Sequence, residues 1–311
     1  MARIAIDAAL GSGFGLIRRQ PGAVLLWGLV YLAVGAASWG VLGSYNLAFL
    51  SHLAANARLG TAALMQAEND MMPRMIAMQG WTWLVNFIFL FVGMVLYCAV
   101  FRAILHPEQK RFGYLRLGAT ELLLFVLCIG FYIVFMVAVI ILALILVVLI
   151  AALFAMHAAA AGIVMGALAA IVTVIVVVWI ALRFSMVGPM MVADSKFHLF
   201  ESWTLTKGHA GILFVMAVCL MAILLVAELV VFGALMVAGA AALAPAVGGM
   251  VNLPSFFERS PSAVAAALAP VLIVAAVILP PLWGCGLAIV GAPWARIYLD
   301  LTEPAPAAVA A

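Results

Sequence analysis

Glu228 has the clearest chemical potential in this chain, because it is an acid inside the apolar stretch LLVAELVVF. An ionised carboxylate at bilayer depth costs several kcal/mol, so an acid there is expected to be protonated or to face a polar partner. Pro280 and Pro281 offer such a partner, since each proline leaves a carbonyl four residues earlier without its helical donor. We therefore predict an intramembrane polar site formed by Glu228, Pro280 and Pro281. The site would either couple a proton or cation to transport or tie two helices together.

The sequence contains no motif for catalysis, metal binding or phosphate binding. There is no HExxH motif, no CxxC pair, no phosphate-binding loop and no Ser, His and Asp set on one face. We therefore predict no catalytic, cofactor or metal site and a protein that is not an enzyme. The net charge of +3, without a basic run among aromatics, argues against a nucleic-acid partner. Buried thiols are a better interpretation of the cysteines than disulfides or metal ligands, because all lie in apolar runs: Cys98, Cys128, Cys219 and Cys285.

Composition places these residues in a membrane protein. Only 8% of the residues are charged and 69% are hydrophobic, whereas about a quarter of a soluble domain is charged. A bilayer crossing takes about 20 apolar residues, and the stretch from Leu122 to Leu182 is long enough for two crossings that fold back at 157–162. Alternation with period two is absent, which favours helices over a barrel. We predict an all-α polytopic membrane protein with six transmembrane helices that start near Gly22, Trp81, Leu122, Ile163, Ile212 and Val264.

The distribution of basic residues predicts the orientation. With the N-terminus inside, the outer loops hold only Arg58, Arg74 and Arg259. Cytoplasmic loops carry an excess of Lys and Arg, so we predict that both termini are cytoplasmic. The other basic residues then all lie inside: Arg3, Arg18, Arg19, Arg102, Lys110, Arg111, Arg116, Arg183, Lys196, Lys207 and Arg296.

Three segments that enter apolar spans resemble one another. Residues 13–27, 111–125 and 200–214 each run from an aromatic through a basic residue and a glycine-containing joint into a span, and each returning span ends near one arginine: Arg102, Arg183 or Arg296. This pattern predicts a single membrane domain, 1–311, built from three tandem hairpins at about 1–105, 106–187 and 188–300, with a short disordered tail at 301–311. The alternative is that charge bias alone produces part of the likeness.

The segments between the hairpins are predicted to be amphipathic elbows in the cytoplasmic interface. Between Arg183 and Gly211, Phe197, Phe200 and Trp203 are spaced three apart, Asp194 could cap a helix, and Lys207 with Gly208 could end it. Residues 2–17 and 104–118 are the equivalent elbows, and a plain solvated loop is the alternative. Glu121 is expected to pair with Arg116 or Arg183, and residues 44–79 to lie on the outer membrane surface. The candidates for contact with lipid headgroups are Arg102, Lys110, Arg116, Arg183, Trp203, Lys207 and Arg296.

One stretch carries a family resemblance. Ser202, Trp203, Leu205, Lys207 and Gly208 stand directly before a span, with Arg183 and Pro189 upstream. This pattern resembles the membrane-domain family attached to some glycerophosphoryl diester phosphodiesterases, and related uncharacterised bacterial inner-membrane proteins. The catalytic barrel of those phosphodiesterases has no counterpart in this sequence, so no phosphodiesterase activity is expected. The resemblance implies a membrane module in a bacterial inner membrane that touches lipid or a separate partner.

Two functions are consistent with these features. The first is a noncatalytic membrane module that faces lipid or binds a partner, which would be membrane lipid, another membrane protein or a separate enzyme. The alternative is a small-molecule or proton-coupled transporter that uses Glu228 and a helix break at Pro280 and Pro281.

Overall fold

The computed structural model describes residues 5–57, 61–155, 159–247 and 261–302. Within these ranges the chain is almost entirely helical and has no strand. Six helices are long and apolar enough to cross a membrane. They are α2 (Pro21–Ala57), α3 (Thr61–Leu105), α4 (Ala119–Ala155), α5 (Ala159–Phe184), α8 (Ala210–Val247) and α10 (Pro261–Thr302). The predicted class, an all-α polytopic membrane protein with six spans, is confirmed.

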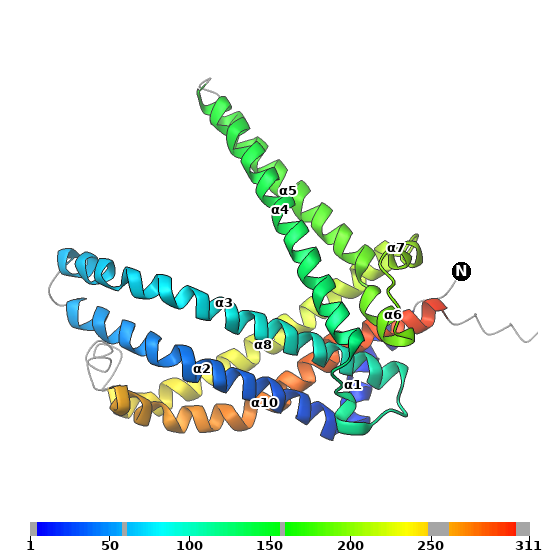
Figure 1. Cartoon of the computed structure of the whole chain (residues 1–311), viewed down its shortest axis with the longest axis horizontal. Helices are drawn as coiled ribbons and strands as arrows, with labels where there is room; N and C mark the ends of the chain where they lie inside the picture. The colour runs from blue at the N-terminus through cyan, green and yellow to red at the C-terminus, as the bar shows by residue number, and fades with distance from the viewer. Residues whose placement is uncertain (1–4, 58–60, 156–158, 248–260, 303–311) are drawn as a thin grey trace, which may run out of the picture. The chain divides into compact units, whose positions relative to one another are not determined.

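In the part of the chain that the structure describes, four shorter elements connect or precede the spans (Figure 1). They are α1 (Ile6–Arg19), the 3-10 helix η1 (Arg111–Tyr114), α6 (Val187–Asp194) and α7 (Phe200–Leu205). The long apolar run from Leu122 is divided into two helices as predicted, but earlier than 157–162, because α4 ends at Ala155 and residues 159–162 already belong to α5. Residues 301 and 302 belong to α10, and the remainder of the predicted tail lies outside the described residues.

The segment at 44–79 is helical where the structure describes it, and its place on the outer membrane surface stays a prediction. Its described residues extend α2 as far as Ala57 and begin α3 at Thr61. The physical reason is the composition of the segment, which is rich in alanine, leucine and methionine and therefore favours helix.

The chain divides into two compact units by its internal contacts. Unit 1 comprises Met1–Ser12, Tyr97–Val218 and Gly291–Ala311, and unit 2 comprises Gly13–Leu96 and Cys219–Val290. These boundaries do not follow the three predicted repeats, and the repeat stays a prediction.

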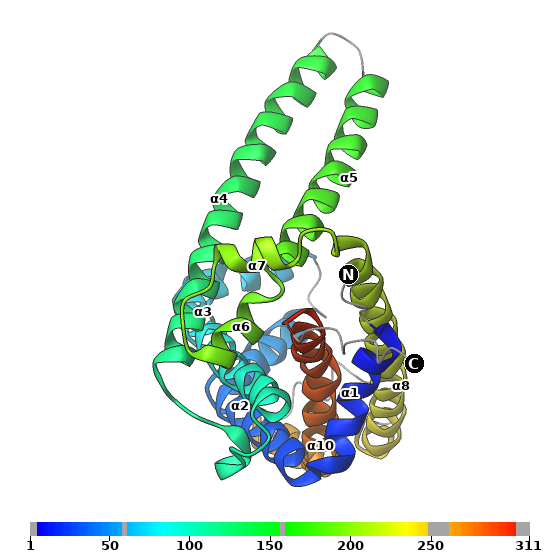
Figure 2. The same ribbon diagram turned by 90° about the vertical axis from the view of Figure 1, so that its right-hand side faces the viewer.

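Unit 1 contains the α4–α5 hairpin and the short helices that follow it. α4 and α5 lie side by side, α6 contacts α4 and α7, and α7 contacts α5 (Figures 1 and 2). Close packing joins the end of α3 to its neighbours, because Gly188 faces the ring of Phe101 and Gly291 faces the side chains of Val100 and Tyr97. Small residues at these contacts let the helices approach closely.

Unit 2 is organised around the contact between α2 and α10. Gly28 of α2 lies directly against the backbone of Pro280, and Gly284 of α10 lies directly against the backbone of Val24. On the same side, the ring of Tyr31 contacts the rings of Phe89 and Trp283, with centroids 5.6 and 5.7 Å away. The two reciprocal glycines therefore set the spacing of α2 and α10.

Candidate functional site

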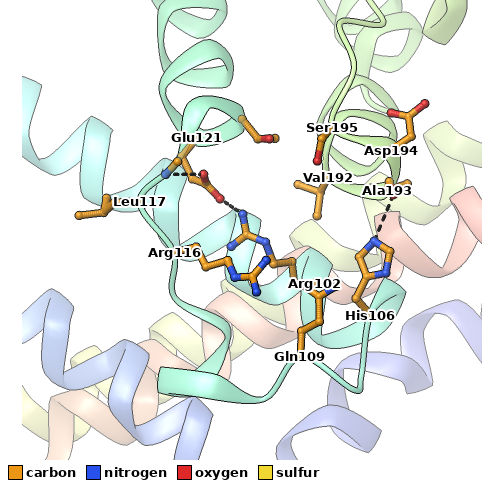
Figure 3. Close-up of a pocket in the computed structure, with 12 residues that line it drawn as sticks. Arg102, His106, Gln109, Arg116, Leu117, Glu121, Val192, Ala193, Asp194 and Ser195 are labelled. Carbon is orange, nitrogen blue, oxygen red and sulfur yellow. Dashed lines mark hydrogen bonds and ion pairs between the residues drawn. The ribbon is translucent and has the colours of Figure 1, made fainter.

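A polar cavity of about 550 Å³ lies in unit 1, where the end of α3, the segment before α4 and the end of α6 meet (Figure 3). Its wall combines charged and polar side chains with a few apolar ones. The lining residues that matter most here are Arg102, His106, Gln109, Arg116, Thr120 and Glu121. Sequence reasoning had placed Arg102 and Arg116 among the candidates for lipid contact, and the structure brings these two together.

A buried ion pair forms one wall of the cavity. Arg102, in the last turn of α3, pairs with Glu121 in the first turn of α4, and the two side chains are only 8% and 2% exposed. Glu121 also accepts a hydrogen bond from the backbone N–H of Gly118 at 3.0 Å, and Arg102 donates to the carbonyl of Tyr114 at 3.0 Å. The pair thus fixes the start of α4 against the end of α3. The predicted partners of Glu121, Arg116 and Arg183, were wrong.

The segment between α3 and α4 is a tight turn and not the amphipathic helix predicted at 104–118. Phe112, Gly113 and Tyr114 have φ values of 49°, 61° and 65°. Left-handed backbone costs about 1–2 kcal/mol at a residue with a side chain, so other contacts must hold it. The Tyr114 side chain supplies them, because it is 1% exposed and its hydroxyl donates to the carbonyl of Pro107 at 3.2 Å. The turn leaves Phe112 exposed.

The segment between α6 and α8 partly follows the prediction. α7 carries Phe200 and Trp203 on its exposed side, and Gly208, with φ of 86°, allows the chain to turn after it, as expected. Asp194, however, does not cap α7. It ends α6, and its carboxylate accepts hydrogen bonds from the Lys196 N–H at 3.2 Å and from His198 at 2.6 Å. Both hydrogen-bond donors to the Asp194 carboxylate therefore come from the short link after α6, which precedes α7.

The residues that carry the family resemblance meet at the end of α5. Ser202 donates to the carbonyl of Arg183 at 2.9 Å, and both Ser202 and Thr206 are fully buried. The Arg183 guanidinium lies 5.4 Å from the ring centroids of both Trp179 and Trp203, within the range of cation–π attraction. These contacts tie α7 to α5. Sequence reasoning missed Trp179 and Thr206, although the four-residue spacing of Trp179 and Arg183 on one helix face was a usable signal.

The remaining headgroup candidates stand apart from the cavity lining. Lys110 and Lys207 are exposed. Arg296 forms an ion pair with Asp300, four residues later on α10, at 3.0 Å. Of the seven candidates for headgroup contact, only Arg102 and Arg116 line the cavity. Arg183 and Trp203 contact each other where α5 meets α7.

The intramembrane polar site stays a prediction, and the described residues provide no contact that supports it. Glu228 is exposed on α8, with no hydrogen bond or ion pair to any part of the chain that the structure describes. α10 continues as one helix through Pro280 and Pro281, so the predicted helix break is absent. Pro280 is buried against Gly28, where its backbone serves the contact between α2 and α10. These features give no support to the transport alternative.

Glu228→Leu is therefore expected to preserve folding. An acid near the middle of a span costs about 2.5–3.5 kcal/mol on insertion scales, and leucine removes this cost without breaking any contact that the structure shows. We expect equal or higher thermal stability in detergent and easier insertion in a translocon assay. Glu228→Gln is the matched control, and a loss of stability with leucine but not with glutamine would restore the predicted polar site.

His198 should make the stability of the link after α6 depend on pH. Its hydrogen bond to Asp194 raises the pKa of His198 above 6.5, against partial burial, which lowers it, and the charges of Asp194 and Glu201 add to the rise. Because the folded pKa is the higher one, the stabilisation is complete below the unfolded value and is lost as the pH rises through the folded value. Exposed pairs of this kind contribute less than about 1 kcal/mol. We expect the melting temperatures of the protein and of His198→Gln to differ when the pH is below the pKa of His198 in the folded protein. Above that pKa the two melting temperatures should agree.

The fold and the site define an all-α polytopic membrane protein with a polar cavity at the ends of its helices. No protein-family model, curated protein or solved structure matches the chain.

Proposed function

We propose that this protein is a noncatalytic membrane module that binds lipid at the cytoplasmic surface of a bacterial inner membrane, with both termini in the cytoplasm. The observation that carries the proposal is the position of the cavity beside exposed apolar side chains. Leu117 lines the cavity and Phe112 stands on the adjoining turn, and each is 79% exposed. A ligand with a polar head and an apolar tail satisfies both kinds of surface.

The aromatic cluster on α5 and α7 supports a place at the membrane interface. Trp179 and Trp203 pack edge to face, with ring centroids 5.0 Å apart, around the Arg183 guanidinium. Phe197 and Phe200 are exposed nearby in the sequence. Tryptophan rings and basic side chains are enriched at the headgroup level of membranes, and exposed phenylalanines suit the acyl boundary.

Two further arguments support the proposal. Basic residues gather on the loops at the ends of the helices that hold the cavity, which favours the cytoplasmic side by the positive-inside rule. The resemblance of the stretch from Arg183 to Gly208 to membrane modules of bacterial phosphodiesterases favours a membrane role without catalysis. Exposed apolar side chains surround α4 and α5. Lipid is sufficient to cover them, so the proposal requires no protein partner.

Native mass spectrometry in mild detergent tests this function. We expect the protein to retain phospholipid, and Gln109→Trp to reduce this retention because Gln109 lines the cavity and a tryptophan side chain fills part of it. Gln79→Trp is the matched control, since Gln79 is exposed on α3 and does not line the cavity. Absence of retained phospholipid from the unaltered protein would contradict the proposal, and equal retention by the two variants would move the lipid site elsewhere.

A further inference from the structure

We propose that the cavity binds the phosphate group of an anionic phospholipid and that Arg116 is the residue that selects it. This inference rests on the proposed function and names the ligand chemistry of the same site. It follows from the charges that line the cavity and from the apolar surface beside them.

The first argument is the charge balance of the lining residues. Arg102 is neutralised by its ion pair with Glu121, and Asp194 is hydrogen-bonded to His198. Arg116 also lines the cavity, is exposed, and forms no ion pair with any acid in the described ranges. The two arginines and two acids of the lining balance formally, but Arg116 is the only one of these four without an ion pair or hydrogen bond in the described ranges, so its guanidinium is free to bind a negatively charged ligand.

The second argument is the position of Arg116 beside another arginine. Figure 3 shows the side chains of Arg102 and Arg116 close together at the cavity, and their like charges repel. An anion between or beside them relieves this repulsion. Phosphate suits this position, because the planar guanidinium group binds two phosphate oxygens at once through parallel hydrogen bonds.

The third argument is the set of uncharged polar groups in the same wall. Gln109 and Thr120 line the cavity with side chains that can donate and accept hydrogen bonds. A volume of about 550 Å³ lies within the usual range of roughly 300–1,000 Å³ for ligand sites. The cavity thus has room for a phosphate group with a small hydroxylated headgroup such as glycerol.

The fourth argument separates a lipid from a soluble phosphate compound. Leu117 forms part of the cavity wall and is 79% exposed, next in sequence to Arg116. A soluble phosphate ester would leave this side chain and Phe112 uncovered, whereas the acyl chains of a lipid would lie against them.

Arg116→Gln and Arg111→Gln form a matched pair for the test. Arg111 is exposed on η1 in the same turn but does not line the cavity, so both changes remove one positive charge from one surface. Each protein is reconstituted in nanodiscs of phosphatidylcholine containing a small fraction of phosphatidylglycerol, and bound phosphatidylglycerol is measured by native mass spectrometry. A second arm measures thermal stabilisation of each detergent-solubilised protein by glycerol phosphate.

The expected result is preferential retention of phosphatidylglycerol, weakened about tenfold or more by Arg116→Gln and little changed by Arg111→Gln. An equal loss of phosphatidylglycerol in both variants would show that the total surface charge, and not Arg116 itself, holds the lipid, and it would overturn the inference. Retention of phosphatidylglycerol that is independent of Arg116 would overturn it as well, while leaving the proposed function intact.

The glycerol phosphate arm distinguishes the source of the phosphate. Stabilisation that depends on Arg116, without retention of any lipid, would keep the phosphate site but overturn both the lipid source and the proposed function. The absence of lipid retention and of stabilisation would overturn both proposals. Because Arg116 has no partner in the described structure, its loss should leave thermal stability without ligand unchanged, which separates binding from folding.

Discussion

Glu121→Gln should lower the free energy of unfolding by about 3–5 kcal/mol, the usual cost of removing one partner from a buried ion pair. The glutamine leaves the positive charge of Arg102 buried without compensation, because the Arg102 side chain is only 8% exposed. It also replaces a charge-assisted hydrogen bond from the Gly118 N–H with a weaker one. Reversible unfolding in mixed detergent micelles measures the loss.

Glu108→Gln is the control for this substitution. Glu108 is 65% exposed and lies 3.6 Å from the His106 ring, so the same chemical change should cost less than about 1 kcal/mol. Similar losses from the two substitutions would show that the pair of Arg102 and Glu121 does not fix the fold.

The double variant Arg102→Met with Glu121→Gln isolates the pair itself. Once the arginine is gone, no buried charge is left alone, so the double variant should lose less stability than the sum of the single variants. Some loss should remain, because Arg102 also donates to the Tyr114 carbonyl and so supports the left-handed turn before α4. Strict additivity of the two losses would show that the side chains act independently.

The partner of Glu121 shows why this site was only partly predictable. Arg116 is close to Glu121 in the sequence and Arg183 ends the returning span, so both were natural candidates. Arg102 ends the preceding helix, and only the turn at Phe112 and Tyr114 brings it to the start of α4. Gly113 between them is of a type that adopts left-handed backbone readily, but Phe112 and Tyr114 are not, so the sequence offered no reason to expect three such residues in a row.

Glu228 shows a second limit of sequence reasoning. The rise per residue of a helix gives the depth of a side chain in a membrane, and by this measure Glu228 lies level with the carbonyls before Pro280. Depth alone says nothing about the direction in which a helix turns a side chain, and α8 leaves Glu228 exposed. The spans themselves were predictable, because the lengths of apolar runs decide them without any knowledge of helix rotation.

The contact between α2 and α10 also depends on helix rotation, and it leads to the second large expected effect. Gly28→Ala should destabilise the protein by about 1–3 kcal/mol or more, because a methyl group there would overlap the backbone of Pro280. Backbone atoms of a continuous helix cannot move aside as a flexible side chain can, so the two helices would have to separate. This separation would also weaken the ring contact of Tyr31 on α2 with Trp283 on α10.

Gly93→Ala on α3 is the matched control, since a methyl group there would meet no atom within 4 Å. Alanine favours helix over glycine by up to about 1 kcal/mol, so this variant should be equally or more stable. Gly284→Ala should resemble Gly28→Ala, because its methyl group would overlap the backbone of Val24 on the same pair of helices. Once one alanine has forced the helices apart, the second should cost less, and the double variant should lose less than the sum. Unfolding in mixed micelles would contradict this account if Gly28→Ala and Gly93→Ala were equally stable.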